Sequence, residues 1–213
     1  MTSSQIAPPL LKGAIVGIDP VNPVASVVVF QYNPDTMSRT LTPLTAGGDA
    51  GPLRLLGPPQ EAIKLSIELD AADQMQPGDA LPDDNGVFPA LAALEMLIYP
   101  KSALVIANEV LARIGVVEVI PAAVPMTLLI WGLKRIVPVR ITEFSITEEA
   151  YNLRLNPVRA KVDLGMQVLT YHDLGMLSPG GALFMAHQIA KEVMATIGSA
   201  GAVPAVVGNS LGL

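Results

Sequence analysis

The fold is decided by the stretch MTLLIWGLKRIVPVRITEFSITEEAYNLRLNPVRAKVDLGMQVLT, residues 126–170. It opens with an apolar run and continues with three runs in which apolar and polar residues alternate: 126–132, 137–146, 151–155 and 160–168. Strict alternation with period two is typical of strands buried on one face, so this stretch predicts the central antiparallel sheet. The alternation slips by one residue at Glu143, which predicts a β-bulge there.

The residues before this stretch predict further strands. Two apolar runs, Gly13–Ile18 and Val24–Phe30, are separated by Asp-Pro and Asn-Pro, which is typical of a hairpin. Ile63–Asp70 alternates strictly and predicts a half-buried strand. Two stretches rich in turn residues, Asp35–Pro59 and Ala71–Gly86, predict long loops, and a loop as long as Asp35–Pro59 is usually a functional or interface feature.

Helical spacing occurs three times in the chain. Phe88–Ile98 predicts a helix, whereas Ser102–Val117 fits either a short helix or a strand. Gly181–Ile197 predicts a helix that ends at Gly198, followed by a tail without charged side chains to Leu213. We therefore predict a mainly β domain over residues 1–170, and a C-terminal helix and apolar tail over residues 171–213.

Composition excludes several classes of function. Hydrophobic residues make up 51% and charged residues 15% of the chain, which predicts apolar surface covered by partners. The formal charge of −6 argues against binding to nucleic acid. The chain has no cysteine, so it has no disulfide framework. The apolar stretch Ala103–Leu133 is interrupted by charged residues and prolines, so we expect no membrane span.

No residue pattern predicts catalysis, a cofactor or a metal. His172 and His187 are not spaced as a ligand pair, and no Gly-x-Ser-x-Gly motif occurs. Two carboxylate pairs fall in predicted turns, where solvated charge is the usual state: Asp83-Asp84 and Glu148-Glu149. Basic residues give local positive charge on the predicted sheet, but aromatic residues for stacking on nucleic acid are few: Lys134, Arg135, Arg140, Arg154 and Arg159.

Five motifs follow one another in the order found in a known family: Phe30-Gln-Tyr-Asn-Pro34, Ile63-Lys-Leu-Ser-Ile-Glu-Leu-Asp70, Leu97-Ile-Tyr-Pro100, Leu129-Ile-Trp-Gly132 and Pro157-Val-Arg-Ala-Lys-Val162. With them, residues 28–170 resemble the tube-like N-terminal domain of the LysM-containing baseplate hub proteins of contractile injection systems, the phage-tail-like particles of bacteria. Nothing after Thr170 resembles LysM, so no peptidoglycan-related role is carried over. The motif residues are Phe30, Tyr32, Asn33, Pro34, Trp131, Gly132, Pro157, Arg159 and Ala160.

The resemblance implies a fold like that of the inner-tube protein, with two packed antiparallel sheets in a sandwich or barrel and a flanking helix. It implies a hexameric ring between the spike hub and the first tube layer, assembled in the cytoplasm. The implied partners are further copies of the chain, the spike or hub protein, the inner tube protein and other baseplate subunits. We expect no nucleic acid, no stable membrane insertion, no cofactor and no enzymatic turnover.

Two alternatives remain beside this adaptor hypothesis. The chain fits a main tube or tube-initiator subunit, which belongs to the same structural class. It also fits a small module that binds carbohydrate or peptide through the Asp35–Pro59 loop. An enzyme is the third alternative, and no residues can be named for it.

Overall fold

The structure, a computed structural model, describes residues 11–18, 26–45, 54–71, 85–113 and 125–210. Its strands are β1 (Ala14–Ile18), β2 (Ser26–Val29), β3 (Met37–Thr42), β4 (Gln60–Asp70), β5 (Met126–Ile130), β6 (Ile136–Tyr151) and β7 (Pro157–Val168). Its helices are α1 (Phe88–Glu95), α2 (Ser102–Arg113), α3 (Tyr171–Leu174) and α4 (Pro179–Ser210).

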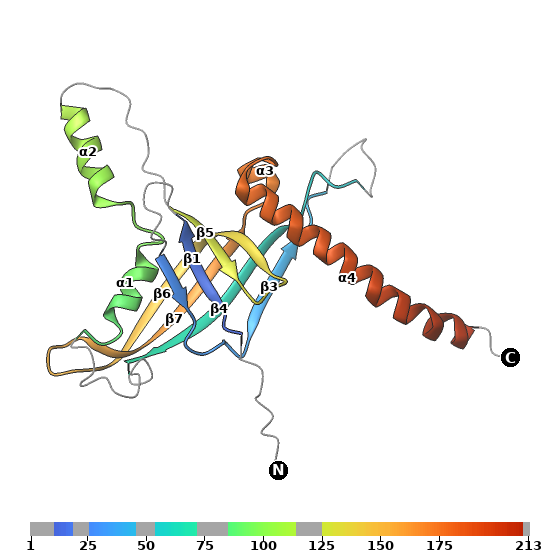
Figure 1. Cartoon of the computed structure of the whole chain (residues 1–213), viewed down its shortest axis with the longest axis horizontal. Helices are drawn as coiled ribbons and strands as arrows, with labels where there is room; N and C mark the ends of the chain where they lie inside the picture. Colours follow the sequence, from blue (N-terminus) through green and yellow to red (C-terminus); the bar gives the residue numbers. More distant parts are fainter. Residues whose placement is uncertain (1–10, 19–25, 46–53, 72–84, 114–124, 211–213) are drawn as a thin grey trace, which may run out of the picture.

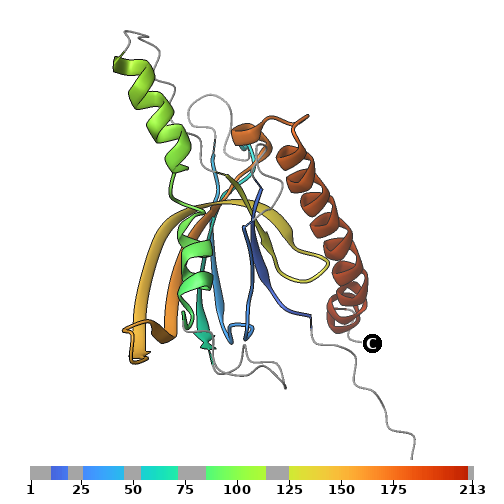
Figure 2. The ribbon, with the colours of Figure 1, turned by 60° about the vertical axis from the view of Figure 1, so that its left-hand side comes forward.

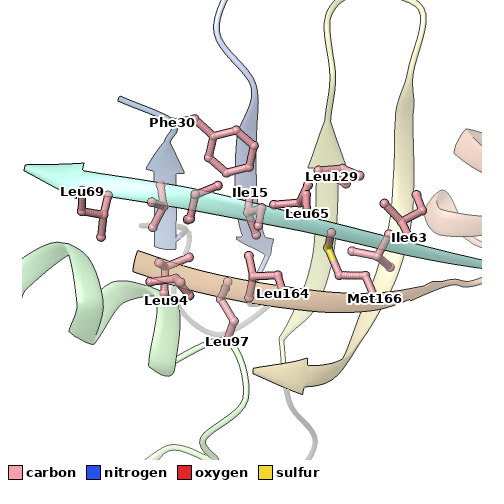
Figure 3. Packing of buried hydrophobic residues seen from close by; sticks show 14 of the residues in the cluster. Ile15, Phe30, Ile63, Leu65, Leu69, Leu94, Leu97, Leu129, Leu164 and Met166 are labelled. Carbon is pink, nitrogen blue, oxygen red and sulfur yellow. The ribbon is translucent and has the colours of Figure 1, made fainter. Parts of the chain in front are cut away.

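All seven strands belong to one antiparallel sheet in the order β2-β1-β5-β6-β7-β4-β3, which confirms the mainly β prediction (Figure 1). The strands form a single sheet rather than two, and the sheet is not closed into a barrel. It curls instead, so that the β2–β1–β5 end packs over β4 and β7 (Figure 3). The predicted hairpin of β1 and β2 and the predicted strand at Ile63–Asp70 are both present.

The core lies inside this curl and follows from the alternation in the sequence. Ile63 and Leu65 on β4 face Ile15 on β1 and Leu129 on β5 (Figure 3). Phe30, which directly follows β2, belongs to the same buried cluster. Helix α1 covers one end of the core with Leu91 and Leu94. Each fully buried side chain of this size contributes about 1.5–3 kcal/mol through the hydrophobic effect.

The predicted β-bulge is confirmed. The pairing of β6 with β7 shifts register between Ile141 and Glu143, after which Phe144 pairs with Leu164. The bulge brings Glu143 over Gly165, where an added Cβ would lie 2.8 Å from Cβ of Glu143. A side chain at position 165 would collide with the Glu143 side chain, so glycine suits the position opposite the bulge.

The prediction of a separate strand at 151–155 is wrong. β6 continues without interruption to Tyr151, and the next five residues form the turn into β7. Leu155 has a φ of 61°, and Leu153 is fully exposed. The side chains alternate in the sequence, but no neighbouring strand covers them, so alternation alone does not indicate burial here.

The prediction that 35–59 is entirely loop is also wrong, because it contains β3. Met37 to Thr42 pair with Leu65 to Gln60 along the edge of the sheet. One face of the strand is polar, and on the other face Arg39 separates Met37 from Leu41, so the apolar alternation by which strands are recognised is interrupted. The remaining loop prediction, Ala71–Gly86, lies mostly outside the described residues.

The helix predictions are confirmed except for one boundary. α1 covers most of Phe88–Ile98, and α2 resolves Ser102–Val117 as helix up to Arg113; residues 114–117 lie outside the described part. α4 does not end at Gly198 but continues to Ser210. A single glycine costs a helix about 1 kcal/mol relative to alanine, which weakens the helix without ending it. α2 and α4 project from opposite sides of the sheet (Figures 1 and 2).

Candidate assembly surfaces

A buried carboxylate joins α4 to the edge of the sheet. Glu61 stands at the start of β4 on the same face as Ile63, and it is only 5% exposed. Its Oε1 accepts hydrogen bonds from Arg39 Nε and Nη2 at 2.7 and 2.6 Å. Its Oε2 accepts one from Lys191 Nζ of α4 at 3.2 Å. One carboxylate therefore connects β3, β4 and α4.

Burial and charge act on Glu61 in opposite directions. Burial alone raises the pKa of its carboxyl group, but the hydrogen bond from Arg39 and the charge of Lys191 outweigh it, so the pKa lies below its usual value. The carboxylate stays ionised at neutral pH. Removing it would leave two cations facing each other without an anion between them.

α4 also contacts the turn between β5 and β6. Nδ1 of His187 lies 3.2 Å from the carbonyl oxygen of Lys134, so the neutral imidazole with a proton on Nδ1 donates to it. Burial lowers the pKa of His187, and the charge of Lys191 lowers it further. Phe184, one turn earlier, is buried in the core and meets Tyr171 edge to face. α4 therefore spans from the β5–β6 turn to the β3–β4 edge.

The same turn carries two cations, Lys134 and Arg135, that form no ion pair with a carboxylate among the described residues. Nη1 of Arg135 lies 3.9 Å from Sδ of Met37, and Nζ of Lys134 lies 4.0 Å from Sδ of Met194. In the described part of the chain, neither side chain has a carboxylate within 4.0 Å. Burial and then the neighbouring charge of Arg39 lower the pKa of Arg135. We define Arg39, Lys134, Arg135 and Lys191 as the basic cluster, in which Arg39 and Lys191 bind Glu61 and the charge of Glu61 also acts on Arg135.

The motif residues 30–34 and 131–132 lie together at the start of β1. The rings of Phe30 and Trp131 are 6.2 Å apart at 58°, which is a tilted aromatic contact. The Asn33 side chain accepts from the Gly13 amide at 2.8 Å and donates to the Leu11 carbonyl at 2.9 Å. Gly132 has a φ of 68°, as the β5–β6 turn requires.

The other motif residues meet at the far end of β4. Gln31 exchanges two hydrogen bonds with the backbone of Asp70, at 2.6 and 2.7 Å. The Asp70 carboxylate accepts from Arg159 at 2.8 and 3.0 Å. The Pro157 carbonyl accepts from the Val87 amide at 2.9 Å, and Ala160 is buried. Tyr32 and Pro34, between the two groups, stand at or near the surface.

Three groups stand out among the exposed large apolar side chains. The tip of the β6–β7 hairpin carries Leu153 and Leu155, and α2 has no buried residue at all. The exposed face of α4 carries a stripe at helical spacing. The exposed residues of the two helices are Leu104, Val105, Ile106, Val110 and Leu111 on α2, and Ile189, Val193 and Ile197 on α4. A chain that stays alone in water rarely exposes so much apolar surface.

The convex face of β3, β4, β6 and β7 is polar instead. Lys64 pairs with Glu143 at 2.7 Å, and Arg140 donates to Gln167 at 2.8 Å. A shallow hollow of about 500 Å³ lies there, beside Ser66. This face carries solvated charges and no buried, perturbed acid or base of the kind that catalysis needs.

The chemical candidates from the sequence do not gather into a site. His172 lies on α3 and His187 on α4, and the described residues contain no group of three or more potential metal ligands. Glu148 and Glu149 are exposed near the end of β6, and Asp83-Asp84 lies outside the described residues. Among the helices that the structure describes, none is long and apolar enough to cross a membrane.

Comparison with known proteins adds no relative. No protein-family model matches the chain, and no curated protein matches it significantly.

The buried carboxylate is the functional residue that sequence reasoning missed. The alternation that predicts the strand at Ile63–Asp70 continues backwards to β4's start at Gln60 and places Glu61 on the buried face. A charged residue at an inward position of a strand indicates a partner. That signal was available, but its partners Arg39 and Lys191 could not be inferred from it.

Proposed function

We propose that the chain is a structural adaptor of a contractile injection system. In this proposal, copies of the chain form a ring, with six copies implied by the family resemblance. The ring links the spike hub to the inner tube and nucleates tube assembly. The role requires rigid contact surfaces and no turnover.

The observation that carries the proposal is the open sheet. In the described residues, β2 pairs only with β1 and β3 pairs only with β4, so both edges of one sheet are left unpaired. Unpaired edges invite further strand pairing unless the protein blocks them. Head-to-tail contact between the β2 edge of one copy and the β3 edge of the next would produce a ring if the rotation closes. A tube-like barrel would then be completed by several copies.

The exposed apolar surfaces support the same proposal. Adjacent subunits or rings would cover Leu153 and Leu155 at the hairpin tip and the apolar side chains of α2. The polar face of β4, β6 and β7 is suited to a water-filled lumen, because its side chains are already solvated or paired on the surface. The five motifs in order connect these features to the baseplate family.

The purified chain provides the first test. We expect closed rings in electron micrographs and a matching mass in light scattering. Val27→Lys places a charge on the exposed β2 edge and should lower the ring fraction. Leu177→Lys, a matched change on an exposed apolar residue before α4, should leave the rings intact. A chain that stays monomeric at high concentration would count against the ring.

Particles from a deletion strain test the adaptor role itself. We expect tubes to be absent or detached from the baseplate, and re-expression of the chain to restore them. Tubes of normal length on intact baseplates would refute the role. The main-tube alternative makes a different prediction, since a tube subunit polymerises alone into filaments rather than single rings.

A further inference from the structure

We propose that the tip of the β6–β7 hairpin of one copy docks on a second copy, on the surface where the β5–β6 turn meets α4. The hairpin tip is residues 148–156. We define the receptor surface as Leu133, Lys134, Arg135, Lys191 and Met194. The inference rests on the self-association proposed above and names one contact in it, but it does not require the sheet edges to pair.

The hairpin tip is held in one shape by its own hydrogen bonds. The Asn152 side chain accepts from the amides of Arg154 and Asn156 at 2.9 and 3.0 Å, and the Asn152 amide donates to the Asn156 carbonyl at 2.9 Å. Ala150 and Leu155 have φ values of 52° and 61°, which glycine adopts without strain. Non-glycine residues in such conformations cluster at functional sites, and here one of them is an exposed leucine.

The hairpin tip presents apolar and acidic side chains together. Leu153 is fully exposed, and Leu155 is 79% exposed. Glu148 and Glu149 are exposed in the same hairpin, at the end of β6. Arg154 is the cation of the segment, so residues 148–156 carry two negative charges and one positive charge. The tip therefore offers leucines to an apolar surface and carboxylates to cations.

The receptor surface has apolar side chains that suit those leucines. Leu133 is 84% exposed in the β5–β6 turn, and Met194 is 45% exposed on α4. Nζ of Lys134 lies 4.0 Å from Sδ of Met194, so the turn and the helix meet at this point. Leucines that pack here would remove apolar area from water on both copies.

The receptor surface also has positive charge to spare. Lys134 and Arg135 form no ion pair with a carboxylate among the described residues. Arg135 is half-buried, and the charge of Arg39 acts on it unfavourably. An incoming carboxylate stabilises such a guanidinium, which can bind it with two parallel hydrogen bonds. Complementary charges of this kind set the register of an interface.

A chain cannot make this contact with itself. β6 begins at Ile136, next to Arg135, and runs for 16 residues to Tyr151 in the hairpin tip. At the usual rise per residue, that strand is about 50 Å long. The hairpin tip and the receptor surface therefore lie at opposite ends of β6 (Figure 1). The contact joins two copies head to tail, and such contacts close into a ring if the rotation allows it.

Charge reversal on the two sides tests the contact. The tip variant carries Glu148→Lys and Glu149→Lys, and the receptor variant carries Lys134→Glu and Arg135→Glu. Each variant alone sets like charges against each other, so we expect self-association to weaken at least about tenfold in sedimentation. In an equimolar mixture, the tip of one variant meets a receptor surface of opposite charge on the other, and association should return.

The control for charge reversal carries Arg140→Glu and Lys161→Glu. These exposed residues lie outside the hairpin tip and the receptor surface. The control changes the net charge of the chain as much as the receptor variant does, and we expect it to associate like the wild type.

Single changes at exposed leucines keep the test valid if charge reversal disturbs folding. Leu153→Ser removes an apolar side chain from the hairpin tip, and Leu133→Ser removes one from the receptor surface. Each should weaken association at least about tenfold, because the lost leucine is buried only in the contact. Leu177→Ser, at a residue that is 99% exposed and outside both surfaces, is the matched control. Circular dichroism confirms that each variant is folded.

Site-directed crosslinking separates this contact from pairing of the sheet edges. The chain has no cysteine, so Leu153→Cys and Leu133→Cys each introduce a single thiol. We expect a mixture of these two variants to give covalent dimers with a short bismaleimide, and a mixture of Leu153→Cys with Leu177→Cys to give few. The crosslink should persist when Val27→Lys, which places a charge on the β2 edge, is added to both variants.

The crosslinks and the rings distinguish the two proposals. Efficient crosslinking at Leu133→Cys in chains that form no rings would support the contact and refute the ring. Rings that form equally well from the tip and receptor variants, or crosslinking no better at Leu133→Cys than at Leu177→Cys, would overturn the contact and leave the ring proposal standing. Failure of the mixed charge-reversed variants to associate, when the wild type does, would also overturn the contact.

Discussion

Replacing Glu61 by glutamine tests whether the buried ion pairs of Glu61 with Arg39 and Lys191 stabilise the folded protein more than an exposed ion pair does. The change keeps the shape of the side chain and removes its charge. Three contacts to the carboxylate are affected, two from Arg39 and one from Lys191. Breaking a buried ion pair costs about 3–5 kcal/mol. The Arg39 and Lys191 side chains are 27% and 42% exposed and recover some hydration, so we expect a loss of about 2–3 kcal/mol.

The chain offers a control with the same chemistry at the surface. Lys64 and Glu143 lie 2.7 Å apart, but their side chains are 66% and 61% exposed. Exposed pairs contribute about 0.2–1 kcal/mol because water screens them. Glu143→Gln should therefore cost less than about 1 kcal/mol, although its ion pair is as short as those of Glu61.

Urea unfolding followed by circular dichroism measures both losses at one low protein concentration. In a chain of this length, 1 kcal/mol corresponds to about 2–4 °C in Tm, so Glu61→Gln should lower Tm by about 4–12 °C. Lys191→Met, combined with Glu61→Gln, should cost less than the sum of the two single changes, since both remove the same contact. Equal losses for Glu61→Gln and Glu143→Gln would refute the reasoning.

Three further predictions concern separate parts of the molecule. Folding lowers the pKa of His187, so its neutral form contributes stability that is complete above pH 6.5 and is lost as pH falls through the folded pKa. We therefore expect the Tm of the wild type to drop between pH 7 and 5.5, and the Tm of His187→Gln to drop by less. Leu155→Gly should raise the free energy of unfolding by about 0.5–1 kcal/mol, because a φ of 61° strains leucine and not glycine; an unchanged urea midpoint would contradict this. Asn33→Ala should cost about 1–3 kcal/mol and speed hydrogen exchange at the Gly13 amide, with protection elsewhere in the sheet as the control.

Predictions from the sequence succeeded where the signal was local. The alternation in 63–70 and 160–168 located β4 and β7, whose side chains alternate between buried and exposed, and the slip at Glu143 located the bulge. They failed at 151–155, where alternating leucines lie in an exposed turn, and at β3, where Arg39 interrupts the apolar face of an edge strand. Both failures have one cause, since whether a side chain is covered depends on a neighbour that the local pattern does not contain.

The candidate functional residues also divide into those that the sequence indicates and those whose contacts only the structure shows. The motif residues were named from their order in the chain, and the structure brings some of them together, with Asn33 holding Gly13 and Phe30 meeting Trp131. It also links Gln31 and Arg159 through Asp70, which no spacing indicated. Of the basic cluster, the sequence indicates only Lys134 and Arg135, as part of the local positive charge on the predicted sheet.

By itself the sequence determined most of the strands and which of their faces are apolar, because side-chain direction in a strand depends only on position parity. From so apolar a composition, with so few charges, it also predicts that the chain has partners. Tertiary structure alone decided that Glu61 meets Arg39 and Lys191, which lie 22 and 130 residues away from it. It also decided that Arg135 is left without a described carboxylate. Pairings over such distances depend on how the whole sheet curls, and no local pattern encodes them.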